Sequence, residues 1–147
     1  MYLLDTNHCT FLIEAEPKVV NHFRELGQVT LATSATVAGE LRFMSQNSQQ
    51  ETANFIKIRA FLNRIDIYPI DAETAEVYGD FKSEIIKRFA VKEKSKRQTT
   101  KLQEIGIGEN DLWIAATALR HSLILVTSDS DFQRMRQVRE FSVESWI

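Results

Sequence analysis

The sequence predicts an α/β fold, a three-layer α/β/α sandwich with a mostly parallel central sheet, and three observations lead to this prediction. Short apolar segments alternate with longer segments in which apolar residues recur at helical spacing. Helices therefore separate the strands, which favours parallel pairing, right-handed crossovers and helices on both faces of the sheet. No repeat, low-complexity tract or linker rich in Pro and Gly interrupts this alternation.

The expected elements follow from local patterns along the chain. Residues 1–4 and 123–126 are short apolar runs, which are typical of buried strands. Strands are expected over residues 2–4, 29–32, 67–69, 123–127 and 141–144. Helices are expected over residues 7–14, 17–26, 35–45, 51–62, 72–89 and 110–120, with a short one around 132–136. A polar, basic loop is expected over residues 90–100.

Length and composition indicate one domain over residues 1–147. The chain has 147 residues, 44% of them hydrophobic, which suits a single core. No segment approaches the roughly 20 apolar residues of a membrane span, and the start lacks the charged region and cleavage site of a signal peptide. We therefore expect a soluble, cytoplasmic protein without membrane contact. Cys9 is the single cysteine, which excludes an internal disulfide, and no Cys/His spacing indicates structural zinc.

Charge is distributed unevenly along the chain. The net charge is −2, yet residues 82–101 carry eight basic and two acidic side chains, a net charge of +6, so the remaining residues carry −8. One interpretation is a basic strip that grips the phosphates of a polyanion beside an acidic pocket. The other is a solvated helix end and loop. Both interpretations stay open from the sequence.

Two acids follow the predicted buried strands. Asp5 comes directly after the apolar start of the chain. Asp129 follows the apolar run over residues 123–126, with Thr127 and Ser128 between. Because ligands bind at the carboxyl ends of the strands in such sheets, both acids are expected at the floor of a site.

Two further acids lie on the apolar faces of predicted helices. Glu40 shares a helix face with Val37 and Leu41, and Asp111 shares one with Ile114. Both carboxylates are therefore expected to point toward the core side. Four converging carboxylates would repel one another and lose hydration, and a hard divalent cation would resolve that conflict.

Each acid also has a local structural interpretation. Asp5 suits an Asx turn or a helix N-cap, Asp129 suits the cap of the short helix that follows, and Asp111 lies in a first helical turn, where the helix dipole favours an acid. Glu40 is different, because a mid-helix acid with apolar neighbours on its face has no local backbone role. The functional interpretation rests on the four acids together.

The local sequences around these acids resemble a known family. Residues 3–7 read LLDTN, 38–41 read AGEL, 106–119 read GIGENDLWIAATAL and 127–132 read TSDSDF. In this order and at these separations the chain resembles the PIN-domain ribonucleases, and specifically the VapC toxins of prokaryotic type II toxin–antitoxin pairs. The resemblance covers nearly the full length. It implies a parallel sheet between helices with the acids at one edge, in agreement with the reading of the patterns.

The resemblance also implies an activity. VapC-like proteins are Mg²⁺- or Mn²⁺-dependent endoribonucleases that cut structured RNA, often tRNA or rRNA, and that a cognate antitoxin holds inactive. Such metal ions can activate a water, offset phosphate charge and stabilise the leaving oxygen. Members usually form homodimers, so RNA, an antitoxin and a second copy of the chain are the expected partners.

Matching motif to motif gives each residue an expected role. Asp5 and Asp111 are expected as direct metal ligands, with Glu40 and Asp129 completing the catalytic pocket. Asp131 lies near Asp129, and a small shift in the match to the family motif would exchange the two residues. Asp129 is preferred because it is closer to the strand end. The supporting hydrogen-bonding residues are expected to be Thr6, Asn7 and Ser128.

Two surfaces are matched less firmly to the family. The antitoxin tail of such pairs occupies a groove between helices; the candidate lining residues are Phe43, Phe55, Phe61 and Leu62, although core packing is the favoured interpretation for them. The basic extension over residues 82–101 is expected to contact RNA, the second subunit or the antitoxin, without a choice among them.

Two other classes of protein compete with the nuclease. A signalling receiver domain would need an adjacent acidic pair after the first strand and a lysine after the last, and the sequence has neither. A non-catalytic RNA- or partner-binding domain on the same fold is the remaining alternative, and the presence of all four acids argues against it. Affinity for Mn²⁺ would separate it from a nuclease.

Overall fold

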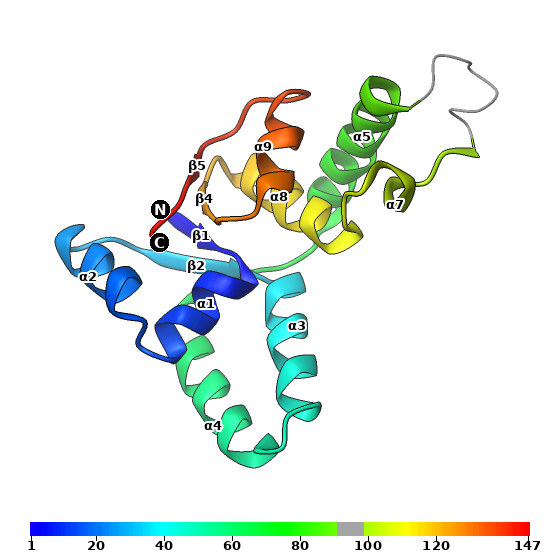
Figure 1. Ribbon diagram of the computed structural model, residues 1–147. Coiled ribbons are helices and arrows are strands. Elements are labelled where there is room, and N and C mark those ends of the chain that lie inside the picture. The colour runs from blue at the N-terminus through cyan, green and yellow to red at the C-terminus, as the bar shows by residue number, and fades with distance from the viewer. Residues whose placement is uncertain (91–98) are drawn as a thin grey trace.

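A computed structural model describes residues 1–90 and 99–147 of the chain (Figure 1). Its described part contains a five-stranded sheet in the order β3-β2-β1-β4-β5, and every neighbouring pair is parallel. The strands are β1 (Tyr2–Leu4), β2 (Leu31–Ser34), β3 (Asp66–Tyr68), β4 (Ile124–Val126) and β5 (Val143–Glu144). The predicted parallel α/β sandwich is therefore confirmed.

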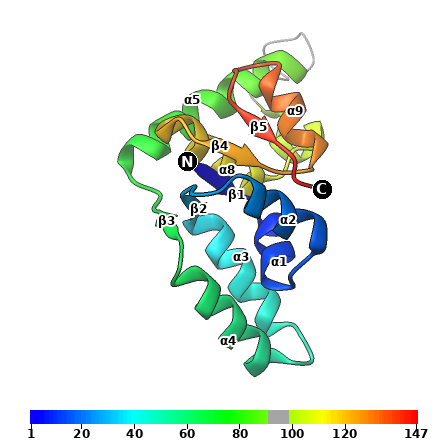
Figure 2. The same cartoon turned by 90° about the vertical axis from the view of Figure 1, so that its left-hand side faces the viewer.

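Helices cover both faces of this sheet. The described helices are α1 (Thr6–Ile13), α2 (Pro17–Glu25), α3 (Ala35–Gln46), α4 (Glu51–Leu62), α5 (Ala72–Phe89), α7 (Leu102–Ile105), α8 (Glu109–His121) and α9 (Ser130–Arg136). Figures 1 and 2 show α1, α3 and α4 on one side of the strands and α5, α8 and α9 on the other. The pair α3 and α4 packs side by side and projects away from the sheet.

The strand order places a topological switch point beside β1. The chain runs outward from β1 through β2 to β3, then returns to β4 on the opposite side of β1. Leu3 pairs with Ala32 on one side and with Leu125 on the other. All three side chains are buried, so the centre of the sheet is also the centre of the core. Ligands of open α/β sheets bind outside the strand ends at such a switch point.

The structure departs from the sequence-based boundaries in several elements. β2 lies two residues later than expected because Thr33 and Ser34, although polar, are buried; the Thr33 hydroxyl donates to the Leu4 carbonyl oxygen at 2.9 Å. The short helix α7 was not expected; it ends at Gly106, whose φ of 81° suits glycine. β5 is shorter than expected. Most of the predicted loop over 90–100 lies outside the described residues.

The packing of the aromatic residues on α3 and α4 is mixed. The interpretation of Phe43 as a core residue is wrong, because its side chain is 66% exposed. Phe61 and Leu62 do pack against the core. Phe55 is half-buried, with the Arg42 guanidinium 4.0 Å above its ring centre.

Among the described helices, none has the length and apolar character that a bilayer span requires.

Candidate active site

All four acids that the sequence singled out line one pocket at the carboxyl ends of β1 and β4. The pocket has a volume of about 310 Å³. Its other lining residues are Thr6, Asn7, Phe43, Met44, Ile114 and Phe132. Helices α3 and α8, which carry Glu40 and Asp111, contact each other across this edge of the sheet. Because β1 and β4 flank the switch point, the pocket occupies the expected ligand position of the fold.

Asp5 is held by the turn that links β1 to α1. It is the N-cap of α1, and its Oδ1 accepts a hydrogen bond from the backbone N of His8 at 2.7 Å. The imidazole Nδ1 of His8 lies 2.9 Å from the same oxygen. Asp5 is 5% exposed and His8 is fully buried. The cap interpretation is thus correct for Asp5, and the cap also aims the carboxylate at the pocket edge.

Asp129 occupies the equivalent turn after β4. It is the N-cap of α9, and its Oδ1 accepts from the backbone N of Asp131 at 2.9 Å. Its own backbone N donates to the Thr127 hydroxyl oxygen at 3.1 Å. Helix α9 therefore begins at Ser130, two residues before the expected start. Asp129 is exposed, so solvent reaches this side of the pocket.

Glu40 projects from the middle of α3 and is held at both carboxylate oxygens. The Thr6 hydroxyl donates to Oε2, and the Asn110 side-chain amide donates to Oε1 at 2.8 Å. These bonds join α3 to the starts of α1 and α8, the helices that bring Asp5 and Asp111 to the pocket. Glu40 is half-buried, and its partners fix the direction of its carboxylate.

Asp111 lies in the first turn of α8 and is the acid most perturbed by its surroundings. Partial burial, followed by the negative charges of Asp129 and Glu40, raises its pKa from 3.8 to about 6. Asp131 and Asp5 contribute in the same direction. The raised pKa reports first the burial of Asp111 and then the negative charge of the surrounding acids. Among the described residues that line the pocket, none is a lysine or an arginine.

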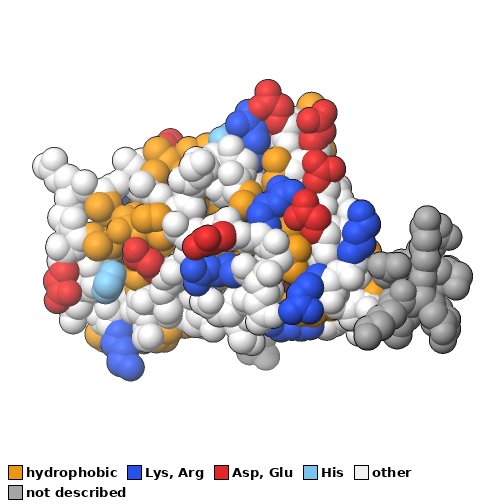
Figure 3. All heavy atoms as spheres, turned by 90° about the horizontal axis from the view of Figure 1, so that it is seen from above, with side chains coloured by type: hydrophobic (Ala, Val, Ile, Leu, Met, Phe, Trp, Pro, Cys, Tyr) orange, Lys and Arg blue, Asp and Glu red, His pale blue; other side chains and the backbone are white. Residues whose placement is uncertain are grey.

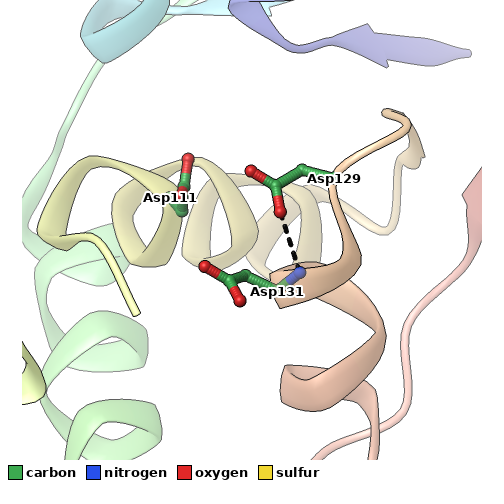
Figure 4. Close-up of side chains that lie close together, drawn as sticks. All are labelled: Asp111, Asp129 and Asp131. Atoms are coloured by element: carbon green, nitrogen blue, oxygen red, sulfur yellow. Dashed lines mark hydrogen bonds between the residues drawn. The ribbon is translucent and has the colours of Figure 1, made fainter. Parts of the chain in front are cut away.

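Asp111 also belongs to a tighter group of three carboxylates with Asp129 and Asp131. One oxygen from each of the three lies within 4.8 Å of the others. Figure 4 shows the three side chains close together. This group and the pocket share Asp111 and Asp129 and differ in the remaining acids. Asp131 does not line the pocket, and it has a cation partner in Arg134, whose Nη1 lies 3.4 Å from Asp131 Oδ1. The four-acid pocket is therefore the better candidate for the metal site.

The three expected supporting residues have different positions. Thr6 lines the pocket and binds Glu40, and Asn7 lines the pocket as an exposed residue. Ser128 does not line it; its hydroxyl lies 2.9 Å from the Ser145 hydroxyl, with which it shares a hydrogen bond. The structure thus places Thr6 and Asn7 at the pocket and turns Ser128 toward the C-terminal segment.

Two residues at the site were missed by sequence reasoning. Asn110 directly precedes Asp111, and its position beside a site acid was the available signal. His8 was not singled out from the sequence, although its position three residues after Asp5, a candidate helix N-cap, was the available signal. Both are polar side chains whose roles depend on contacts with residues distant in the sequence.

The donor set fits a hard divalent cation. The pocket offers carboxylate oxygens from four acids, and Mg²⁺ and Mn²⁺ favour such ligands. A cation there would offset the negative charge that contributes to the raised pKa of Asp111.

Over the face in Figure 3, basic and acidic side chains are interspersed. Four of the eight basic residues over 82–101 lie outside the described residues, so the basic extension stays a prediction.

Comparison with known proteins agrees with this geometry. A parallel α/β sheet with acids gathered at its switch point is the architecture of PIN domains, and the family model described as PIN domain matches residues 2–138, so the chain belongs to the PIN-domain family. It is 30% identical to Ribonuclease VapC2 of Haemophilus influenzae, over 99% of this chain and 98% of that protein. It is 29% identical to the tRNA(fMet)-specific endonuclease VapC of Shigella flexneri, over 99% and 97%.

A solved structure extends the comparison to three dimensions. The chain superposes with a TM-score of 0.79 and 28% identity on a chain of VapBC2 from Rickettsia felis bound to a DNA fragment from their promoter. The match covers 99% of this chain and 98% of that one. The predicted VapC resemblance is thereby confirmed in both sequence and fold.

Proposed function

We propose that this protein is a VapC-type endoribonuclease that depends on Mg²⁺ or Mn²⁺ and acts as the toxin of a toxin–antitoxin pair. One observation carries the proposal: four carboxylates, two from the turns after β1 and β4 and two from α3 and α8, meet in a single pocket without a basic residue among its described lining. The ribonuclease names of the relatives and the VapBC complex among the solved structures support the same class.

In this proposal Asp5 and Asp111 hold the ion, and Asp129 and Glu40 complete the site. A bound Mg²⁺ or Mn²⁺ would polarise the scissile phosphate and lower the pKa of an attacking water. Asp111 must be ionised to act as a ligand, so its raised pKa sets the pH range in which the site can load. Thr6 and Asn110 hold Glu40 in a fixed direction, which suits orientation of a water or of the substrate.

RNA and an antitoxin are the proposed partners. The relative from Shigella flexneri is named for cleavage of tRNA(fMet), which supports tRNA ahead of rRNA as the substrate class for this chain. The Rickettsia felis structure contains toxin and antitoxin together, which supports a cognate antitoxin as the inhibitor. The homodimer stays a prediction from the family resemblance.

Cleavage of total cellular RNA by the purified protein tests the proposal. The reactions contain Mn²⁺ or Mg²⁺, with EDTA in a parallel set. We expect discrete fragments that require metal and disappear in the Asp5→Asn and Asp111→Asn variants. Asp80→Asn is the matched control, because Asp80 is an exposed acid on α5 that does not line the pocket.

Two results would contradict the proposal. Wild-type cleavage by both Asp5→Asn and Asp111→Asn would remove the site assignment. A protein without affinity for Mn²⁺ and without cleavage would exclude the nuclease, and would leave a non-catalytic RNA- or partner-binding domain on this fold as the function.

A further inference from the structure

A buried histidine contacts Asp5, one of the acids that line the pocket. His8, in the first turn of α1, is fully buried, and its two ring nitrogens have different partners. Nδ1 lies 2.9 Å from Asp5 Oδ1, and Nε2 lies 3.5 Å from the backbone N of Trp146. The edges of the Phe11 and Trp146 rings pack against the imidazole, with ring centres 5.5 and 6.4 Å away.

These partners define the tautomer of His8. A backbone N–H can only donate, so Nε2 accepts from Trp146 and carries no proton. In a neutral imidazole the proton then resides on Nδ1, which donates to the Asp5 carboxylate. The backbone N–H of Trp146, which follows β5, therefore determines that Nδ1 is the nitrogen that donates to Asp5.

The consequence for Asp5 is an asymmetric carboxylate. Oδ1 accepts two hydrogen bonds from His8, one from the backbone N at 2.7 Å and one from Nδ1 at 2.9 Å. Within the described part of the chain, these are the hydrogen bonds that the Asp5 carboxylate accepts, and both are made to Oδ1. Asp5 also lines the pocket, so Oδ2 is the oxygen available there to a ligand.

We propose that His8 is a positioning residue for Asp5: its Nδ1–H, fixed by the Trp146 backbone, anchors Oδ1 and leaves Oδ2 to bind the divalent cation. The inference rests on the proposed metal site. Partners that hold metal-ligating side chains typically contribute 10–100-fold to metal affinity. The ring of Trp146 packs on Tyr2, at 5.4 Å between centres, and on His22, at 5.3 Å, so the anchor is itself rigid.

The test is the affinity of the full-length protein for Mn²⁺, measured by calorimetric titration with the metal alone. His8→Phe keeps a buried ring but removes the donor, and we expect its dissociation constant to rise about 10–100-fold. His8→Asn places an amide N–H near the position of Nδ1, so it should recover most of the lost affinity. If His8→Phe does not fold, His8→Leu replaces it with the same expectation.

Cys9→Ala is the control for a purely structural effect. Cys9 is a fully buried neighbour on the same helix, and its thiol donates to the Thr33 hydroxyl oxygen at 3.7 Å, so it does not supply a hydrogen bond to Asp5. Burial raises the pKa of its thiol to about 12, so it stays uncharged. This variant should lose stability, measured by urea unfolding, and keep the wild-type affinity for Mn²⁺.

The outcomes separate the inference from the proposed function. Wild-type affinity in His8→Phe, or an equal loss in His8→Phe and Cys9→Ala, would overturn the positioning role while leaving the metal site intact. Absence of Mn²⁺ binding by the wild-type protein would overturn both. Loss in His8→Phe with recovery in His8→Asn would support the positioning role.

A second measurement needs no variant. Long-range ¹⁵N–¹H correlation spectra of the metal-free protein report which ring nitrogen of His8 carries the proton. We expect the Nδ1–H tautomer. An Nε2–H tautomer or a doubly protonated ring would contradict the hydrogen bond from Trp146 and overturn the inference.

Discussion

Asp111→Asn should stabilise the metal-free protein at neutral pH. The raised pKa means that folding makes ionisation of Asp111 unfavourable, so the folded state binds a proton more tightly than the unfolded state does. A shift from 3.8 to about 6 corresponds to about 3 kcal/mol when the carboxylate is fully ionised. Because Asp111 is partly exposed, solvent screening reduces the expected gain to about 1–2 kcal/mol.

The pH dependence follows from the sign of this shift. Well below pH 3.8 the side chain is protonated in both the folded and the unfolded state, so it does not change the stability of the fold. Stability is lost as the pH rises through the window from 3.8 to about 6, and the full cost is present above it. The gain from Asp111→Asn should therefore be complete at pH 7.5 and about a third as large at pH 4.5.

Urea unfolding in EDTA at these two pH values measures the effect. Asp80→Asn removes the same charge from an exposed position on α5 and should change the free energy of unfolding little. A gain that is equal at both pH values would refute the reasoning, because it would not arise from ionisation. A destabilised Asp111→Asn at pH 7.5 would refute it too.

Three further predictions concern metal binding, the Asn110 contact with Glu40 and the role of Ser128. The Mn²⁺ affinity of the wild-type protein should fall about tenfold per pH unit below pH 6, because the ion competes with a proton on Asp111; a flat profile by titration calorimetry would contradict this. Asn110→Ala should lower cleavage of RNA about tenfold by releasing Glu40 Oε1, and unchanged single-turnover rates would show that the bond is unimportant. Ser128→Ala should cleave RNA like the wild type, because its hydroxyl binds Ser145; a large loss of rate would restore the supporting role expected from the sequence.

The parts of the site that lie at strand ends were predictable from the sequence. Asp5 and Asp129 follow short apolar runs, and parallel strands end at one edge of the sheet, so their meeting follows from the fold. Glu40 was predictable because a mid-helix acid on an apolar face has no local partner. Asp111 needed the motif around it, because an acid in a first helical turn is common on electrostatic grounds alone.

The remaining features depend on contacts that no local pattern encodes. His8 is bound by Trp146, which is 138 positions away, and Asn110 binds Glu40 across 70 positions. Ser128 has the residue type and position of a site hydroxyl, yet the C-terminal segment supplies a nearer partner in Ser145.

The predicted bounds of β2 and the predicted burial of Phe43 were wrong for similar reasons, because both depend on tertiary contacts. β2 continues through Thr33 because its hydroxyl finds a backbone acceptor in the sheet, which makes a polar residue compatible with burial. Phe43 fits the apolar spacing of a core residue, yet α3 extends beyond the body of the protein and leaves it exposed at the pocket.

The position of a bound ion tests the central claim most directly. In crystals soaked in Mn²⁺, anomalous scattering locates the metal without reference to activity. The account predicts a peak in the pocket about 2.1 Å from carboxylate oxygens of Asp5 and Asp111, with Asp5 bound through Oδ2. No peak in the pocket, or one confined to Asp129 and Asp131 on its outer side, would contradict it.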